Sequence, residues 1–245
     1  MSFARDKLSL HVADKGLAAF RSFRSKSDVR ARARESFARH DLSRYAGLMG
    51  DKVRDAEVRR AAHSRLLRHA RTCPDTLVID ELGLGHGACR VDIAVINGHI
   101  RGLEIKAEAE ALDRLPHQVT AYGEVVDRAT LIAAPRHLAT ALEIVPMWWG
   151  VIVADRGRTG GVVFRKFREE RANLHVDPMM LARLLRHPEA AAILREHGRP
   201  ERVLRQPREV LYRELVDILP RRVLAYRVRE TLKNRATWRD HPEPL

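Results

Sequence analysis

Hydrophobic residues change from helical to strand spacing near Pro74. Between Asp51 and Ala70 they recur at intervals of three or four positions, which predicts a helix that ends before Pro74. Three segments with strand patterns follow: TLVIDELGL, RVDIAVIN and HIRGLEIKA. The last two are separated by Asn97-Gly98, a dipeptide typical of tight turns. The pattern therefore predicts a helix followed by a β-meander.

Helices and strands alternate further along the chain. Residues 112–126 predict a helix with Pro116 in its first turn, and the strand ATLIAA, the helix RHLATALEIV and the strand WGVIVAD follow. The segment GGVVFRKF is expected to add an edge strand or a hairpin arm. From Asp177 onward four helical patterns each begin with proline: PMMLARLLRH, PEAAAILREHG, PREVLYRELVDIL and PRRVLAYRVRETLKNR. This order predicts an α/β fold with a mixed sheet and a small C-terminal helical domain.

Charge is distributed unevenly along the 245 residues, whose formal net charge is +13. Residues 1–50 carry 11 basic and 5 acidic side chains, residues 51–154 carry 13 and 14, and residues 155–245 carry 21 and 13. We expect a basic, partly helical N-terminal arm (1–50), a core (51–170) and a basic helical domain (171–245). Basic flanks attract polyanions, of which nucleic acid is the commonest. A GC-rich coding sequence would also enrich arginine, but it does not explain why the excess avoids the centre.

Composition favours a cytoplasmic protein without a membrane partner. No apolar run approaches the roughly 18 residues that would span a bilayer. The first twenty residues are charged throughout and lack the apolar centre of a secretory signal. The two cysteines, Cys73 and Cys89, are too few for a disulfide framework or a four-thiolate zinc site, so we expect reduced thiols.

The segment GLEIKAE places an acid and a lysine on one face of a strand. Residues two apart in a strand share a face, so Glu104 and Lys106 are neighbours. Asp92, on the preceding strand, lies opposite Leu103 if the hairpin loop has two residues, and opposite Glu104 if the loop includes His99. The sequence leaves both loops open, and only the second brings the two carboxylates together.

Two carboxylates opposed across a ladder repel each other unless a cation lies between them. Mg²⁺ suits such a pair, because it binds one or two carboxylates together with water and phosphate oxygens. A lysine beside the ion can stabilise developing negative charge or position an attacking water. These groups indicate phosphodiester hydrolysis. The alternative is an exposed edge hairpin whose charged residues form ordinary ion pairs.

The spacing of these residues resembles the PD-(D/E)XK nuclease superfamily. The resemblance consists of Asp92, the run Glu104-Ile105-Lys106 and the segment QVTAY, which begins at Gln118 and matches a motif of the RecB-like branch. It covers approximately residues 51–155. More narrowly, the chain resembles an uncharacterised bacterial open-reading-frame family of the Sce series. One departure is that valine, and not proline, precedes Asp92.

This resemblance implies a restriction-endonuclease-like αβββαβ core that binds Mg²⁺ or Mn²⁺. It implies metal ligation by Asp92, Glu104, the Ile105 carbonyl and Glu57. Lys106 would serve catalysis, Gln118 would orient the lysine or the scissile phosphate, and Tyr122 would pack beside it and contact nucleic acid.

Other candidate residues have simpler explanations. Glu81 is either a further ligand or a polar residue at a strand end. The GLGHG stretch lacks the Lys-Ser/Thr of a P-loop, which indicates a turn. The histidines His86, His99 and His117 form no zinc spacing. The run Met147-Trp148-Trp149 is expected in the core or at a contact between domains, with stacking on a base as the alternative.

The C-terminal helices are rich in arginine. Six of these residues are Arg202, Arg205, Arg208, Arg221, Arg222 and Arg229. They are expected to contact phosphates, Arg221 and Arg222 above all, or to form a helix-turn-helix-like module. The alternative is that they are the solvated faces of a small helical bundle. Taken together, the sequence predicts a metal-dependent DNA nuclease, with a catalytically inactive nucleic-acid-binding module on the same fold as the alternative. A homodimer is a further possibility, by analogy with restriction enzymes.

Overall fold

The computed structural model describes residues 53–235, which lie within one compact unit of the chain. The predicted N-terminal arm (1–50) lies outside the described residues. The predicted boundaries at residues 50 and 170 stay predictions. No helix within residues 53–235 has the length and apolarity needed to cross a membrane.

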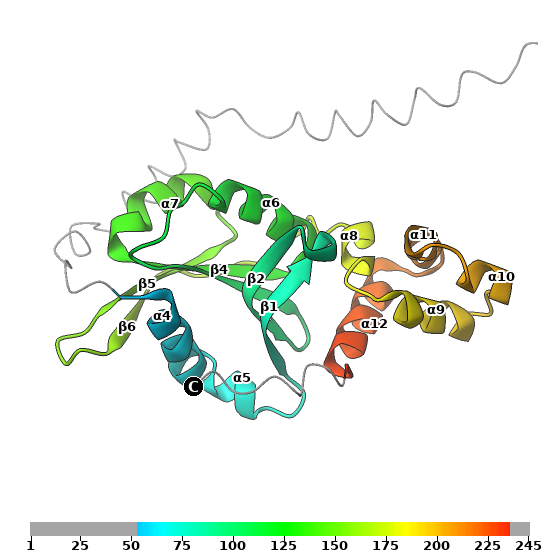
Figure 1. Cartoon of the computed structure of the whole chain (residues 1–245), viewed down its shortest axis with the longest axis horizontal. Helices are drawn as coiled ribbons and strands as arrows, with labels where there is room; N and C mark the ends of the chain where they lie inside the picture. Colours follow the sequence, from blue (N-terminus) through cyan, green and yellow to red (C-terminus); the bar gives the residue numbers. More distant parts are fainter. Residues whose placement is uncertain (1–52, 236–245) are drawn as a thin grey trace, which may run out of the picture. The chain divides into compact units, whose positions relative to one another are not determined.

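A six-stranded mixed sheet forms the centre of the described part, and its strands are arranged in chain order (Figure 1). The strands are β1 (Leu77–Leu84), β2 (Cys89–Ile96), β3 (Ile100–Lys106), β4 (Arg128–Ala133), β5 (Gly150–Arg156) and β6 (Val162–Arg168). The first three form an antiparallel meander, β4 and β5 continue parallel to β3, and β6 returns antiparallel to β5. The predicted α/β class is confirmed, and the expected edge strand is β6.

The β2–β3 hairpin has the three-residue loop that the sequence left open. Ile93 pairs with Leu103 and Ile96 pairs with Ile100, so residues 97–99 form the loop. The loop is closed by hydrogen bonds from the amide of Asn97 to the His99 carbonyl and from the amide of His99 to the Asn97 side chain. Continuing this register by one residue places position 92 opposite position 104.

Helices cover both faces of the sheet (Figure 1). One face carries α4 (Asp55–Ala61), the π-helical turn η1 (Ala62–Leu66) and α5 (Arg68–Thr72), and the other carries α6 (Leu115–Val125) and α7 (Leu138–Ile144). The predicted single helix before Pro74 is therefore interrupted, because the amide of Leu67 bonds the carbonyl of Ala62 five residues earlier. The apolar core between η1 and the sheet includes Ala62, Ile93 and Leu103.

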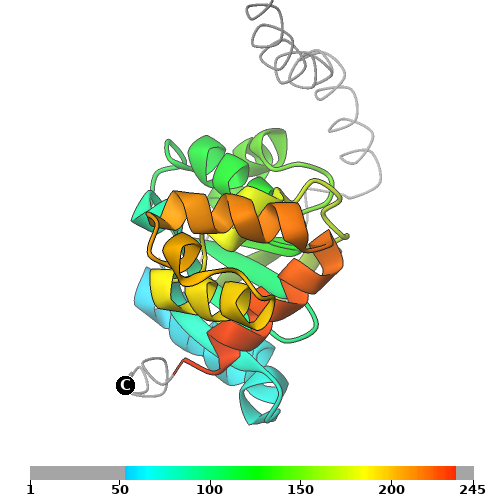
Figure 2. The ribbon, with the colours of Figure 1, turned by 90° about the vertical axis from the view of Figure 1, so that its right-hand side faces the viewer.

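Five helices follow the sheet (Figure 2). They are α8 (Pro178–Ala182), α9 (His187–Glu196), α10 (Glu201–Leu204), α11 (Arg208–Ile218) and α12 (Arg221–Lys233). The single turn α10 was not predicted. Helix α11 packs against α8 and α9, and α12 packs against α8 and β2. The predicted helices are present, whereas neither a separate C-terminal domain nor a restriction-endonuclease-like core is confirmed.

Hydrogen bonds connect the helices to the sheet part of the unit. The side-chain amide of Asn173 donates to the carbonyls of Gly123 and Val126 at the end of α6, at 2.8 and 2.9 Å. A second contact joins the turn after β1 to α11. There His86 stacks on Tyr212 with 5.9 Å between ring centroids, and the Nε2 atom of His86 lies 3.3 Å from Glu209 Oε1. His86 lies in the GLGHG stretch, which is the predicted turn and includes the short helix η2 (Gly85–Gly87).

Candidate functional site

Glu104 and Lys106 form a buried pair on β3. This strand lies inside the sheet, between β2 and β4, so its side chains are covered on both faces. The Lys106 ammonium donates to Glu104 Oε1 at 2.7 Å, with 0% of the Glu104 and 3% of the Lys106 side chain exposed. The second oxygen of Glu104 accepts the hydroxyl of Tyr122 from α6 at 2.6 Å. Both oxygens of the carboxylate therefore have a donor.

Asp92 joins this buried group from β2. Its Oδ2 accepts the backbone N–H of Ile105 at 2.7 Å. Arg59 on α4 donates to the backbone carbonyl of Asp92 at 2.7 Å, and its guanidinium lies 3.5 Å from Asp92 Oδ1 and 3.3 Å from Glu81 Oε1. We call Asp92, Glu104, Lys106, Tyr122 and Arg59 the buried charge network.

The network shifts the pKa values of its acids upward. Burial raises the pKa of Glu104 to about 7, and the charge of Asp92 adds to this effect against the opposing influence of Lys106. Burial also raises the pKa of Asp92, while the Ile105 N–H and Arg59 act in the opposite direction. The pKa of Tyr122 is raised well above its ordinary value by burial and by Glu104. Glu104 therefore titrates near neutral pH.

The structure does not bring Glu57 into this network. Arg156 at the end of β5 donates two hydrogen bonds to the Glu57 carboxylate, at 2.9 and 3.1 Å. Arg156 lowers the pKa of Glu57, which keeps the carboxylate ionised. The Ile105 side chain points into the apolar core on the α4 side, and its amide is used by Asp92.

The two predicted residues of α6 occupy different environments. Gln118 is half-buried, and its Oε1 is buried without a hydrogen-bond partner among residues 53–235. Tyr122 is fully buried, and its ring lies 5.1 Å from that of Trp149. The predicted nucleic-acid contact through Tyr122 has no support in this position, because the ring exposes no surface on which a base could stack.

The buried charge network is a poor fit for the predicted Mg²⁺ or Mn²⁺. Lys106, Tyr122 and Ile105 already donate hydrogen bonds to the two carboxylates, and Arg59 forms an ion pair with Asp92. Within the described ranges there is no group of three or more His, Cys, Asp and Glu side chains that could hold a metal. The metal ligands stay a prediction from spacing, and the geometry is that of a closed hydrogen-bonded network.

Several minor candidates are placed by the structure. Trp149 is fully buried, as expected for the core, whereas Met147 is partly exposed. Glu81 lies within β1, where it has a positive φ of 59° and no pairing partner on β2. Its carboxylate forms ion pairs with Arg59 and Arg90. Both cysteines of the chain are free thiols.

Two buried or half-buried polar residues were missed by sequence reasoning, one of them in the buried charge network. Arg59 is the member of the network that was missed. Its position four residues after Asp55 is a signal for an ion pair on a helix, and its Nε atom lies 3.5 Å from the Asp55 carboxylate. The other is the buried His63, whose Nε2 lies 2.9 Å from Asp80 Oδ1. No local pattern connects His63 with Asp80, because the two residues lie on different elements.

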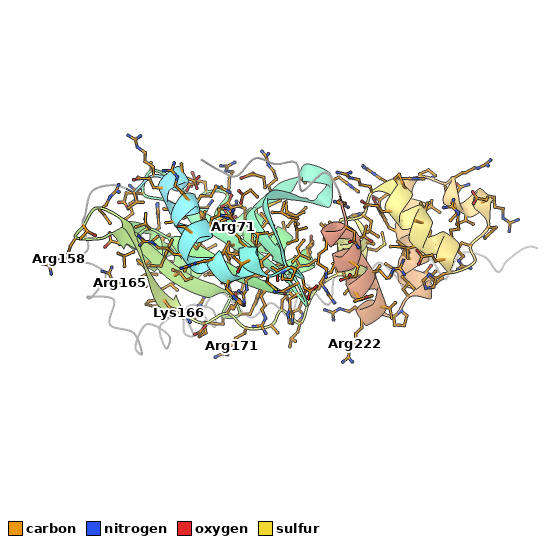
Figure 3. The ribbon with its side chains drawn as sticks, turned by 90° about the horizontal axis from the view of Figure 1, so that it is seen from below. Arg71, Arg158, Arg165, Lys166, Arg171 and Arg222 are labelled. Carbon is orange, nitrogen blue, oxygen red and sulfur yellow. The ribbon has the colours of Figure 1, made fainter. Side chains whose placement is uncertain are left out.

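A second candidate site is an exposed basic surface on the C-terminal helices. Six arginines on or between α10, α11 and α12 are exposed: Arg202, Arg205, Arg208, Arg213, Arg221 and Arg222. None of the six forms an ion pair with another residue of the described range. Figure 3 shows the Arg222 side chain pointing away from α12. We call these six residues the arginine surface.

Four of the five nearby carboxylates do not compensate this surface. Residues 201–233 contain five acidic side chains, and four of them are held by other basic residues. These four are Glu201, Glu209, Glu214 and Glu230, whose partners are Arg195, Arg183, Arg199 and Lys233. The positive charge of the arginine surface is therefore available to an external anion.

Comparison with known proteins relates the chain to a phage protein. A family model described as bacteriophage P4 protein cII matches residues 50–240. Protein cII of Enterobacteria phage P4 is 23% identical over 191 residues, an alignment that covers 76% of this chain and 69% of that protein. No solved structure gives a significant match.

These matches overturn the resemblance to the PD-(D/E)XK superfamily. The family model covers the whole segment on which that resemblance rested, and it continues through the C-terminal helices. The prediction of a metal-dependent DNA nuclease, and of a hydrolase in general, was therefore wrong. In physical terms, two carboxylates and a lysine at the required spacing form a buried, internally hydrogen-bonded network in this fold.

Proposed function

The chain belongs to the bacteriophage P4 protein cII family, and from its basic helices we propose that it binds nucleic acid, DNA in particular, without cleaving it. The observation that carries the proposal is the arginine surface, with six exposed guanidinium groups that lack a carboxylate partner among residues 53–235. Arg221 and Arg222, the residues selected from the sequence, belong to it. The C-terminal helices α10 to α12 are then the part of the protein that holds nucleic acid.

Electrostatics gives this proposal its physical basis. Each arginine that contacts a phosphate releases counterions condensed on the nucleic acid, so the affinity falls as salt rises. Guanidinium groups suit phosphate because they present several donors in a fixed plane. An arginine already paired with a carboxylate must first break that contact, whereas the six arginines of this surface need not. Binding would therefore be sensitive to salt and weakly dependent on sequence.

A charge-matched pair of variants tests the proposal. Fluorescence anisotropy would measure the affinity of the full chain for labelled duplex DNA at several salt concentrations. The double variant Arg221→Gln/Arg222→Gln removes two charges from the arginine surface. The control Arg114→Gln/Arg136→Gln removes two exposed arginines from the α6 and α7 side of the sheet.

We expect salt-dependent binding, and a clear loss of affinity in the first variant alone. The slope of log affinity against log salt should decrease in magnitude by about two, one unit for each phosphate contact removed. The control should retain the wild-type slope. Equal loss in both variants would show that net charge and not this surface is responsible, and no binding at any salt concentration would reject the proposal.

Two further expectations remain proposals. A cytoplasmic location is where a DNA-binding protein of this composition would act. A homodimer would double the number of arginines that face one DNA molecule, which strengthens binding to a long phosphate backbone. Sedimentation of the full chain, alone and with duplex DNA, would determine the number of copies in the complex.

A further inference from the structure

The outward face of α12 combines an exposed aromatic ring with two arginines. Arg222, Tyr226 and Arg229 are spaced four and three residues apart, so their side chains lie one above the other on the helix. The opposite face carries Leu224, Val228 and Leu232, all of which are buried. We call the three outward residues the α12 stripe.

The aromatic ring of Tyr226 is exposed to solvent and is not part of the packed core. Its exposed fraction is 55%, whereas the other tyrosines of the described part, Tyr122 and Tyr212, are nearly fully buried with hydroxyl groups that donate hydrogen bonds. Val223, one turn earlier on α12, is also exposed, at 40%. An aromatic ring and an apolar side chain on an otherwise charged helix mark a contact surface.

The charges beside the ring favour an anionic partner. Neither Arg222 nor Arg229 forms an ion pair within residues 53–235. The single acidic residue of α12, Glu230, lies 2.6 Å from the ammonium of Lys233. Arg227 on the adjoining side is neutralised by Glu196 of α9, also at 2.6 Å. The α12 stripe is therefore positive on both sides of its aromatic ring.

A groove beside the ring provides room for a planar group. It has a volume of about 490 Å³ and lies between α9 and α12. Tyr226, Thr231 and Asn234 form part of its lining, together with Ile193 of α9. The lining also contains three carboxylates, each of which is paired with a basic side chain: Glu189 with Arg235, Glu196 with Arg227 and Glu230 with Lys233. Hydroxyl and amide groups next to apolar side chains suit a nucleobase, which has two flat faces and hydrogen-bonding edges.

From this arrangement we infer that the α12 stripe binds single-stranded nucleic acid. An unpaired base stacks on Tyr226, and the phosphates on its two sides contact Arg222 and Arg229. Stacking on a protein side chain needs a base that has left the duplex stack, which selects single strands over duplexes. This inference rests on the proposed nucleic-acid binding and specifies the form of nucleic acid that the same helices prefer.

Substitutions of Tyr226 test the inference on matched probes. The full chain, Tyr226→Ala and Tyr226→Phe would be titrated with a labelled single-stranded DNA, the duplex of the same sequence and the corresponding RNA. Wild type should bind the single strand more tightly than the duplex. Tyr226→Ala should weaken single-strand binding by about fivefold to a hundredfold, and Tyr226→Phe should retain it, since the ring remains. Duplex binding should change by less than about twofold in both variants, because the phosphate contacts remain.

The outcomes separate this inference from the proposed function. Binding that is lost in Arg221→Gln/Arg222→Gln but unchanged in Tyr226→Ala would overturn the stacking role and retain the arginine surface. Equal weakening of single strands and duplexes in Tyr226→Ala would also overturn it. No binding of any probe by wild type would reject both. Tyr226→Gln, which keeps the helix and removes the ring, repeats the test if Tyr226→Ala unfolds. The comparison of DNA with RNA shows whether the sugar is recognised.

Discussion

The Lys106 ammonium lies 2.7 Å from a carboxylate oxygen of Glu104, and both side chains are almost completely removed from solvent. In a buried ion pair of this kind each charge compensates the other, because burying either charge alone would strongly destabilise the folded protein. The relationship explains why an apolar strand contains a lysine: its charge compensates an acid two residues earlier.

Replacing only the lysine should destabilise the protein strongly. At about pH 8, where Glu104 is ionised, Lys106→Met removes the donor and leaves Glu104 buried without its cation, which costs about 3–5 kcal/mol. The double variant Glu104→Gln/Lys106→Met should recover much of this loss, because the carboxamide still accepts the Tyr122 hydroxyl without an isolated charge. Urea unfolding of wild type, single and double variants measures the coupling. A single variant as stable as wild type would show that the pair contributes nothing.

The raised pKa of Glu104 makes stability depend on pH. Its value is about 7 in the folded protein, against an ordinary value of 4.5, so the folded state holds the proton more tightly. The contribution of this carboxyl is then fully present below about pH 4.5 and is lost as the pH rises towards 7.

Glu104→Gln should remove that decrease with rising pH. The difference in unfolding free energy between wild type and Glu104→Gln, measured at several pH values, isolates this group, because every other ionisable side chain is present in both proteins. A difference that stays constant from pH 4.5 to 7 would mean that Glu104 titrates at its ordinary pKa.

Gly102 allows the ring of Tyr122 to approach the sheet. A Cβ atom added at this position would lie 2.8 Å from Tyr122 Cε1 and 3.2 Å from Val91 Cγ1. We expect Gly102→Ala to destabilise the protein by about 1–3 kcal/mol, since neither neighbour can move freely in the core. Gly98→Ala in the same hairpin is the matched control, because its Cβ would meet no atom within 4 Å. Equal unfolding midpoints for the two variants would contradict this account.

Asn173 fixes the segment that leads from the sheet to the C-terminal helices. Its amide donates to two backbone carbonyls at the end of α6, and its Oδ1 accepts the N–H of His175. Asn173→Ala should cost about 2–3 kcal/mol, because these buried backbone groups lose their partner. Leu174→Ala, at a side chain that is 75% exposed, should be close to neutral. The same urea titration distinguishes the two variants.

The spacing of hydrophobic residues predicted the main helices and strands, but it did not predict the irregular or very short ones. Hydrophobic spacing located all six strands, because the inner strands β2 to β5 bury runs of apolar residues in a covered sheet and the two edge strands still contain several apolar residues. It did not predict the π-helical turn at residues 62–66 or the short helix α10. A π-turn preserves the apolar spacing on either side of it, and a helix of four residues has too few positions to show a period.

The sequence predicted several of the residues that meet at the candidate site, but the nuclease role predicted for them was wrong. The sequence narrowed the hairpin register to two alternatives, because each loop length fixes one register, and one of them brings Asp92 and Glu104 together. Which groups satisfy those carboxylates depends on contacts distant in sequence, such as Tyr122 and Arg59. Spacing alone cannot distinguish carboxylates that bind a metal from carboxylates that accept donors of the protein itself.

The order of the strands bears on how the chain acquires its structure during synthesis. Because every strand pairs only with the strands that directly precede and follow it in the chain, none has to insert between two strands already joined. Each new strand leaving the ribosome meets a completed edge, and the loops to be closed stay short, which favours rapid folding. The sheet can therefore grow in one direction, from β1 to β6, before the arginine-rich helices have been made.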